Sequence, residues 1–305
     1  MSLDTLRSSV RGHVHHLLFA PRSAWPMAIA RIVIGIGILG WAVSMMFEVS
    51  TFMSDDGLVG PDFASSDFRW ITLDSAGSVQ ITLIVLTLAS IPIIIGFRPT
   101  IFLVVAFILL VAVQRRTPII LNSGDIILRN LTLLLAFTPT SAALSFDRWR
   151  RLGRDGLRTA PLVAPWGLRF VQLQMMLVYF FAFWGKTGDQ WREGTAVSTA
   201  FRLTDLHRFG PPGILTDNLL VSGLLTWGTL VVELALAVLL WYKPARPVLI
   251  VAGLVLHFTI DTFVLVGFFG IAMAAGLMTF LDGDSVQRFV DRRRARARPT
   301  AATTT

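Results

Sequence analysis

Long apolar runs separated by short polar or basic segments make up most of the chain. Bounded by proline, glycine or charge, the runs lie at about 27–47, 79–97, 100–116, 124–140, 167–186, 219–241 and 246–281. A run of roughly 20 apolar residues is long enough to cross a bilayer as a helix. The last run is too long for one span, and a break near Val264 to Gly267 divides it into two short helices. The pattern predicts an all-α, polytopic membrane bundle of about eight transmembrane helices.

Basic residues indicate how these helices are oriented. If the N-terminus is cytoplasmic, the basic groups fall on one side: Arg7, Arg11, Arg22, Arg98, the cluster from Arg148 to Arg158, Lys243, Arg246 and the tail from Arg288 to Arg298. This is the positive-inside pattern. It predicts eight spans in a bacterial-type plasma membrane with both termini cytoplasmic. Seven spans would export the arginine-rich tail, and a re-entrant last hairpin is the other alternative.

The composition agrees with a multi-pass membrane protein. Hydrophobic residues make up 54% of the chain and charged residues 15%, against roughly 25% charged residues in soluble domains. The absence of cysteine excludes disulfides, thiolate metal sites and thiol redox chemistry. Because the net charge of +8 is divided among particular loops, membrane lipids rather than nucleic acid are the expected partners.

The chain divides into three parts by composition. Residues 1–26 form a cytoplasmic lead, residues 27–282 the transmembrane domain, and residues 283–305 a basic tail that we expect to be disordered. The first outer loop, 48–78, is rich in aspartate, which fits an extracytoplasmic face. The longest cytoplasmic connection, 140–166, is expected to hold a basic interfacial helix from Phe146 to Leu157.

Polar and ionisable side chains collect at the predicted outer ends of four helices. They are Arg116, Asn122, Asp125, Lys186, Trp191, Glu193, His257 and Asp261. A charge inside an apolar segment is costly, so such groups normally face a cavity and pair with one another. Their similar depth indicates one shared polar site.

Several of these residues have a structural alternative. Lys186 is either an interfacial anchor or, when partly desolvated, a reactive base or nucleophile. Asp125 suits a helix N-terminus and has Arg129 as its expected salt partner at i+4. His257 is either an ordinary core histidine or one whose tautomer is fixed by Asp261, also at i+4. Two ligands at this spacing do not make a recognisable metal site, so no metal is expected.

Short motifs occur in a fixed order over about residues 24–282. They are the run Arg31 to Gly35, the run Asn122 to Asp125, the run Ser145 to Asp147, Lys186 followed by Trp191 and Glu193-Gly194, and His257. In this order the chain resembles the HTTM (horizontally transferred transmembrane) domain family, which includes the membrane part of vitamin K-dependent gamma-carboxylases and the SdpB-type proteins. Lys186 matches the lysine that deprotonates vitamin K hydroquinone in the carboxylases.

The resemblance implies an outward-facing pocket that binds a lipophilic, quinone-like molecule, with a reduced quinone of the menaquinone or vitamin K type as cofactor. Lys186 would be the base, with His257 held by Asp261 as its proton partner. The residues expected to orient the ligand are Asn122, Asp125, Arg129, Arg116, Trp191 and Glu193.

The sequence also departs from the carboxylases. They carry a histidine in the segment that matches Asn122 to Asp125, and this chain has none there. The alternative function is a non-enzymatic, SdpB-like accessory for the maturation, export or tolerance of a secreted peptide, in which Lys186 is structural. A transporter is a weaker alternative, since no interrupted helix pair recurs in the two halves.

Overall fold

The computed structural model describes residues 3–54, 57–59, 73 and 75–296. Within these residues the fold is helical apart from one antiparallel pair of two-residue strands, β1 (Arg22–Ser23) and β2 (Leu162–Val163), and an isolated bridge between His207 and Val264. The predicted all-α class is confirmed. The aspartates of the first outer loop between 55 and 74 lie outside the described residues.

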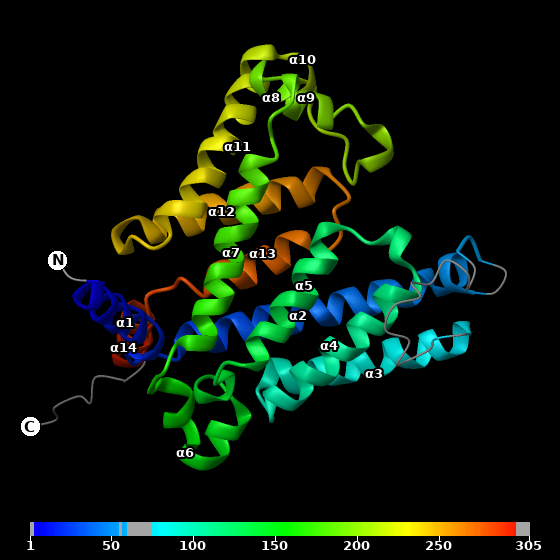
Figure 1. Ribbon diagram of the computed structural model, residues 1–305. Coiled ribbons are helices and arrows are strands. Elements are labelled where there is room, and N and C mark those ends of the chain that lie inside the picture. Colours follow the sequence, from blue (N-terminus) through cyan, green and yellow to red (C-terminus); the bar gives the residue numbers. More distant parts are fainter. Residues whose placement is uncertain (1–2, 55–56, 60–72, 74, 297–305) are drawn as a thin grey trace, which may run out of the picture.

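Apolar helices form one bundle (Figure 1). They are α2 (Trp25–Glu48), α3 (Ala76–Ile95), α4 (Pro99–Arg116), α5 (Ser123–Ala136), α7 (Trp166–Trp184), α11 (Leu219–Leu239), α12 (Arg246–Phe263) and α13 (Phe269–Met278). By length and composition the described chain has 6 helices able to cross a membrane, or up to 7 if α5 and the bent segment after it are one span. A polytopic membrane bundle is therefore confirmed, and the number eight stays a prediction.

The predicted division of the last apolar run is confirmed. Helix α12 ends at Phe263 and α13 begins at Phe269. Between them the chain bonds to a distant loop, because the Leu265 N–H donates to the Leu206 carbonyl at 2.7 Å. Gly267 has a φ of +66°, and a Cβ at this position would lie 2.6 Å from Asn122 Nδ2. Glycine thus allows the break to pack against the start of α5.

Shorter helices cover the two ends of the bundle (Figure 1). The first group is α1 (Leu3–Phe19), α6 (Phe146–Arg158) and α14 (Gly283–Arg296), which we call the basic end. The second group, which we call the loop end, includes α8 (Asp189–Arg192), α9 (Ala196–Ala200) and α10 (Gly213–Asp217). It also includes the π-helix η1 (Val49–Met53) and the short helices η3 (Pro118–Ile120) and η5 (Thr204–Leu206). The helices η4 (Thr140–Ala142) and η6 (Lys243–Ala245) complete the basic end.

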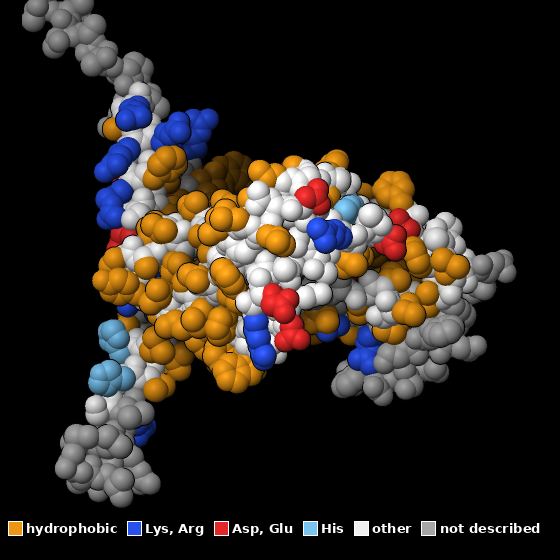
Figure 2. Space-filling model, turned by 90° about the horizontal axis from the view of Figure 1, so that it is seen from above, with side chains coloured by type: hydrophobic (Ala, Val, Ile, Leu, Met, Phe, Trp, Pro, Cys, Tyr) orange, Lys and Arg blue, Asp and Glu red, His pale blue; other side chains and the backbone are white. Residues whose placement is uncertain are grey.

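The surface reflects this division. Figure 2 shows hydrophobic side chains over much of the bundle, and Lys, Arg and His side chains along the edge where α1 and α14 lie. The expected helix from Phe146 to Leu157 is present as α6, with a break in the helical backbone at Gly153. At its start the Ser145 hydroxyl accepts the Arg148 N–H at 3.1 Å. Its location at the membrane interface stays a prediction.

The described part of the tail differs from the expected disorder, because α14 is helical from Gly283 to Arg296. Residues 297–305 lie outside the described residues. Asp282 Oδ2 accepts hydrogen bonds from the Ser285 hydroxyl and N–H at 2.7 and 3.0 Å, which lower the pKa of the Asp282 carboxyl. Gln287 then ties the helix to the bundle: its Oε1 accepts from Trp25 Nε1 at 2.9 Å and its Nε2 donates to the Arg158 carbonyl at 3.0 Å. These long-range contacts explain why a polar segment is ordered here.

One cation joins the elements of the basic end. Arg31, on α2, has 0% of its surface exposed. Its Nη1 donates to the carbonyls of Thr140 at 2.5 Å and Ala143 at 3.4 Å. Its Nη2 donates to those of Leu144 at 2.6 Å and Ile94 at 3.4 Å. The guanidinium therefore ties α2 to the end of α3 and to the segment between α5 and α6.

We expect Arg31→Leu to destabilise the bundle by about 2–4 kcal/mol, because it leaves buried carbonyls without donors and hydrogen bonds to charged groups contribute roughly 1.5–3 kcal/mol each. Arg31→Lys should keep only part of the stability that Arg31→Leu loses, since an ammonium lacks the planar fork of donors. Thermal unfolding in detergent measures both. Arg150→Leu, at an exposed arginine of α6, is the matched control, and an equal effect there would contradict the prediction.

The sidedness of the two ends is predicted from the positive-inside pattern. Because the chain has no cysteine, single cysteines report it directly. In intact cells a membrane-impermeant maleimide should label Gly210→Cys at the loop end, and should label Asp284→Cys on α14 only after permeabilisation. Labelling of Asp284→Cys without permeabilisation would reverse the assigned orientation.

Candidate functional site

Lys186 forms an ion pair inside the bundle. It follows the last turn of α7, and its Nζ donates to both carboxylate oxygens of Glu233, on α11, at 2.8 and 2.7 Å. The third donor goes to the Ala182 carbonyl at 3.0 Å. The side chains of Lys186 and Glu233 are 21% and 9% exposed. Since an ammonium has three donors, Lys186 is fully satisfied as a cation.

Trp191 and Glu193, the other two residues of the lysine motif, have different surroundings. The Trp191 ring lies under Lys186, with its centroid 5.2 Å from Nζ. Its carbonyl accepts from Trp227 Nε1 at 3.2 Å, which ties the motif to α11. Glu193 is exposed, and its side chain has no hydrogen-bond or ion-pair partner in the described part of the chain. Trp191 is thus part of the lysine site and Glu193 is not.

The expected pairing of His257 with Asp261 is wrong. His257 Nε2 lies 2.9 Å from the hydroxyl of Tyr179, on α7, and the imidazole packs edge-on against Phe269. Asp261 Oδ2 accepts the Gly270 N–H of α13 at 3.0 Å. The i+4 spacing puts both residues on one face of α12, but Tyr179 of α7 bonds to His257 and the backbone of α13 bonds to Asp261, so the two side chains have different partners.

The expected ion pair between Asp125 and Arg129 is also wrong. Asp125 Oδ1 accepts from Trp41 Nε1 at 2.8 Å, and its Oδ2 accepts the Asn122 N–H at 3.0 Å. The Asn122 side chain in turn accepts the Asp125 N–H at 3.2 Å, which completes a capping box at the start of α5. Arg129 Nη1 donates to Gln114 Oε1 at 3.1 Å. The Asp125 carboxylate therefore bonds to Trp41, a buried tryptophan on α2, and not to Arg129 on the next turn of α5.

Arg116 bonds to described backbone of the segment between α2 and α3. It is 4% exposed. Its guanidinium donates to the carbonyls of Leu73 at 3.1 Å and of Val59 and Met53 at 3.3 Å. These contacts hold loop backbone at the loop end, away from the partners of Lys186.

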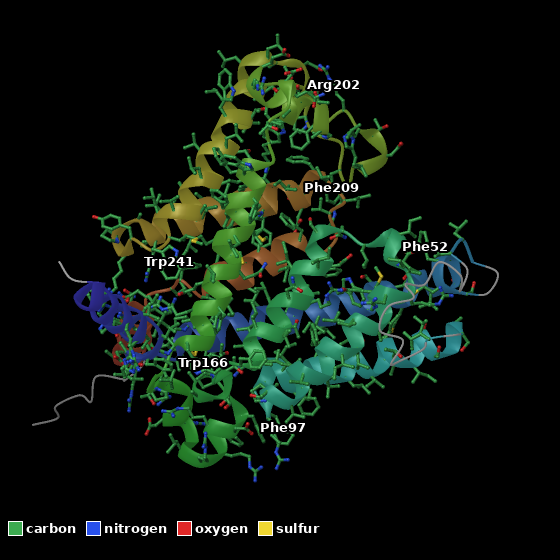
Figure 3. The ribbon with its side chains drawn as sticks, in the orientation of Figure 1. Phe52, Phe97, Trp166, Arg202, Phe209 and Trp241 are labelled. Carbon is green, nitrogen blue, oxygen red and sulfur yellow. The ribbon has the colours of Figure 1, made fainter. Side chains whose placement is uncertain are left out.

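A separate cavity of about 580 Å³ opens at the loop end. Its polar lining includes Asn122, Asp125, Gln114, Arg208 and Asp261. Its apolar lining includes Trp41, Met45, Phe209, Phe258, Phe268 and Ile271. Figure 3 locates Phe209 on the loop that crosses the end of α12. The predicted polar site is therefore divided in two: Asn122, Asp125 and Asp261 belong to the cavity, and Lys186 to the ion pair.

Sequence reasoning missed Glu233 and Tyr179. Glu233 is the carboxylate inside the apolar run 219–241, and an acid in such a run is itself a signal of a functional or paired group. Tyr179 is one of 2 tyrosines in the chain and gave no comparable signal. In the described residues no group of three His, Cys, Asp or Glu is placed to hold a metal ion.

Removal of either partner of the ion pair should destabilise the protein by about 3–5 kcal/mol, because it leaves an uncompensated buried charge. The double variant Lys186→Gln with Glu233→Gln should cost clearly less than the sum of Lys186→Gln and Glu233→Gln. Unfolding in detergent with a double-mutant cycle gives the coupling. Additive effects would mean that the two side chains do not interact.

Comparison with known proteins agrees with the motif order in the chain. The HTTM domain family matches residues 19–284. No curated protein and no solved structure matches the chain. The match covers most of the bundle, from the segment before α2 to the start of α14. This integral membrane protein belongs to the HTTM domain family.

Proposed function

We propose that the protein binds a lipophilic, weakly acidic ring molecule of the reduced-quinone class beside the Lys186–Glu233 pair and takes a proton from its hydroxyl. The observation that carries this proposal is the saturation of all three Lys186 donors by Glu233 and the Ala182 carbonyl inside an apolar bundle. Desolvating two charges is expensive, and such pairs in membrane helices normally serve a substrate or proton pathway.

The hydrogen bonds indicate which residue of the pair accepts the proton and which one stabilises the ligand anion. Lys186 as an ammonium has no lone pair, so the basic group is the Glu233 carboxylate. When a ligand hydroxyl approaches, its proton goes to Glu233 and the ammonium pairs with the new ligand oxyanion. The negative charge moves from the carboxylate to the ligand, and the net charge of the site stays constant. Lys186 itself acts as a base only after it has passed its own proton to Glu233.

The surroundings suit a flat apolar ligand. Trp191 presents an aromatic ring next to the ammonium, and aromatic faces stack on ring systems. His257, bonded to Tyr179, stays in the proposal as a second proton partner. It is buried, and its Nδ1 has no hydrogen-bond partner within the described chain.

Anaerobic titration of purified protein with a short-chain menaquinol tests the proposal. The absorbance of the hydroquinone monoanion should rise on binding at neutral pH, because the ammonium stabilises the oxyanion. Lys186→Gln and Glu233→Gln should each reduce the bound monoanion at least tenfold, whereas Arg192→Gln, at an exposed arginine 3.8 Å from Asp189, should not. An unchanged Kd and spectrum in Lys186→Gln would overturn the proposal.

The alternative function, an accessory for a secreted peptide, rests on the SdpB-type resemblance. In that case the pair is structural, so the charge-reversed variant Lys186→Glu with Glu233→Lys should keep both stability and the cellular phenotype. Under the proposed proton transfer this variant keeps stability and loses monoanion formation. The reversed pair therefore separates the two functions.

A further inference from the structure

The cavity at the loop end is independent of the proposed proton site. Lys186, Glu233 and His257 do not line it. It lies where α5 and α13 begin and α12 ends, and Arg208 and Phe209 contribute from the adjoining loop. Its volume of about 580 Å³ is within the range of small-molecule sites, about 300–1,000 Å³.

Some polar groups of the lining are already satisfied. Both oxygens of Asp125 accept hydrogen bonds, from Trp41 Nε1 and the Asn122 N–H. Gln114 donates to the Asp125 carbonyl and accepts from Arg129. The hydrogen bonds of these residues are used within the protein, so few of their donors and acceptors remain for a ligand.

Three groups of the lining are not satisfied within the described residues. Asp261 Oδ1 is buried without a donor. Asn122 Nδ2 donates to no described acceptor, since the Asn122 side chain bonds only through its oxygen. Arg208 is exposed at the cavity, and its guanidinium has neither a hydrogen bond nor an ion pair there. Asp261 and Arg208 thus line one cavity and attract each other across it, but in the described residues they do not come within ion-pair distance.

This arrangement discriminates between classes of ligand. A ligand with only an anionic group would pair with Arg208 but would be repelled by the carboxylates of Asp261 and Asp125. A ligand with only a cation would satisfy Asp261 and leave Arg208 unpaired. A neutral ring would leave the two charges with only each other, beyond ion-pair distance, as counterions. Unpaired charges and polar groups are what a binding site rejects most strongly.

We propose that the cavity binds an amphiphile whose head carries both an ammonium and a phosphate, an aminoalkyl phosphate. The ammonium donates to Asp261, the phosphate accepts from Arg208 and Asn122, and the apolar chain lies against Met45, Ile271 and the aromatic residues of the lining. A primary ammonium is preferred over a quaternary one because it can approach the Asp261 carboxylate closely and donate an N–H to it.

Calorimetric titration of the whole protein in detergent tests this site. Dihexanoyl phosphatidylethanolamine should bind about tenfold more tightly than the phosphatidylcholine and phosphatidic acid of the same chain length. In Asp261→Asn the phosphatidylethanolamine should bind no more tightly than the phosphatidic acid. In Arg208→Gln the affinity for each of these two lipids should fall about tenfold. Asp205→Asn and Arg202→Gln, exposed residues of the same loop, are the matched controls and should change nothing.

The lipid comparison on the unaltered protein needs no variant, so it stands if Asp261→Asn fails to fold. Equal binding of the three lipids would overturn the proposal. O-phosphoethanolamine without a chain should bind weakly; if it binds as tightly as the lipid, the zwitterion site is supported and its source is a soluble molecule. Lys186→Gln should leave lipid binding unchanged, which keeps this test separate from that of the proton site.

Discussion

The fold depends on how buried carbonyls find donors where helices end inside an apolar bundle. Arg31 is the main solution at the basic end, because one fully buried guanidinium donates to four carbonyls from two separate segments. In a membrane no water replaces such donors, so each unsatisfied backbone group is costly. A single side chain thereby ties together α2, the end of α3 and the segment after α5.

The same constraint also accounts for two of the charged residues that the sequence singles out. Arg116 donates to three carbonyls of the segment between α2 and α3, and Asp125 is occupied by a helix cap and a tryptophan. What remains is a small set of groups without a purely structural task. The Lys186–Glu233 pair and the unsatisfied lining of the cavity are the main members of this set, and each supports a separate proposal.

Sequence reasoning predicts local features well here and distant ones poorly. The apolar runs, the break after Phe263 and the helix α6 follow from composition over a few neighbouring residues. The pairing of His257 with Tyr179, 78 residues away, and of Lys186 with Glu233, 47 residues away, depends on which helices pack together. The i+4 rule predicted partners for Asp125 and His257 that tertiary contacts replaced, and the order of α14 rests on a contact across 262 residues.

The shortness of α5 and α13 has a consequence for what crosses the bundle. With 14 and 10 residues at about 1.5 Å per residue, they are roughly 21 and 15 Å long, against about 30 Å for the hydrocarbon core of a bilayer. Both begin at the floor of the cavity, and α13 is mostly covered by other helices. A water-filled cavity above them would leave a thinner insulating layer than the surrounding membrane, so the membrane potential would fall most steeply across this layer.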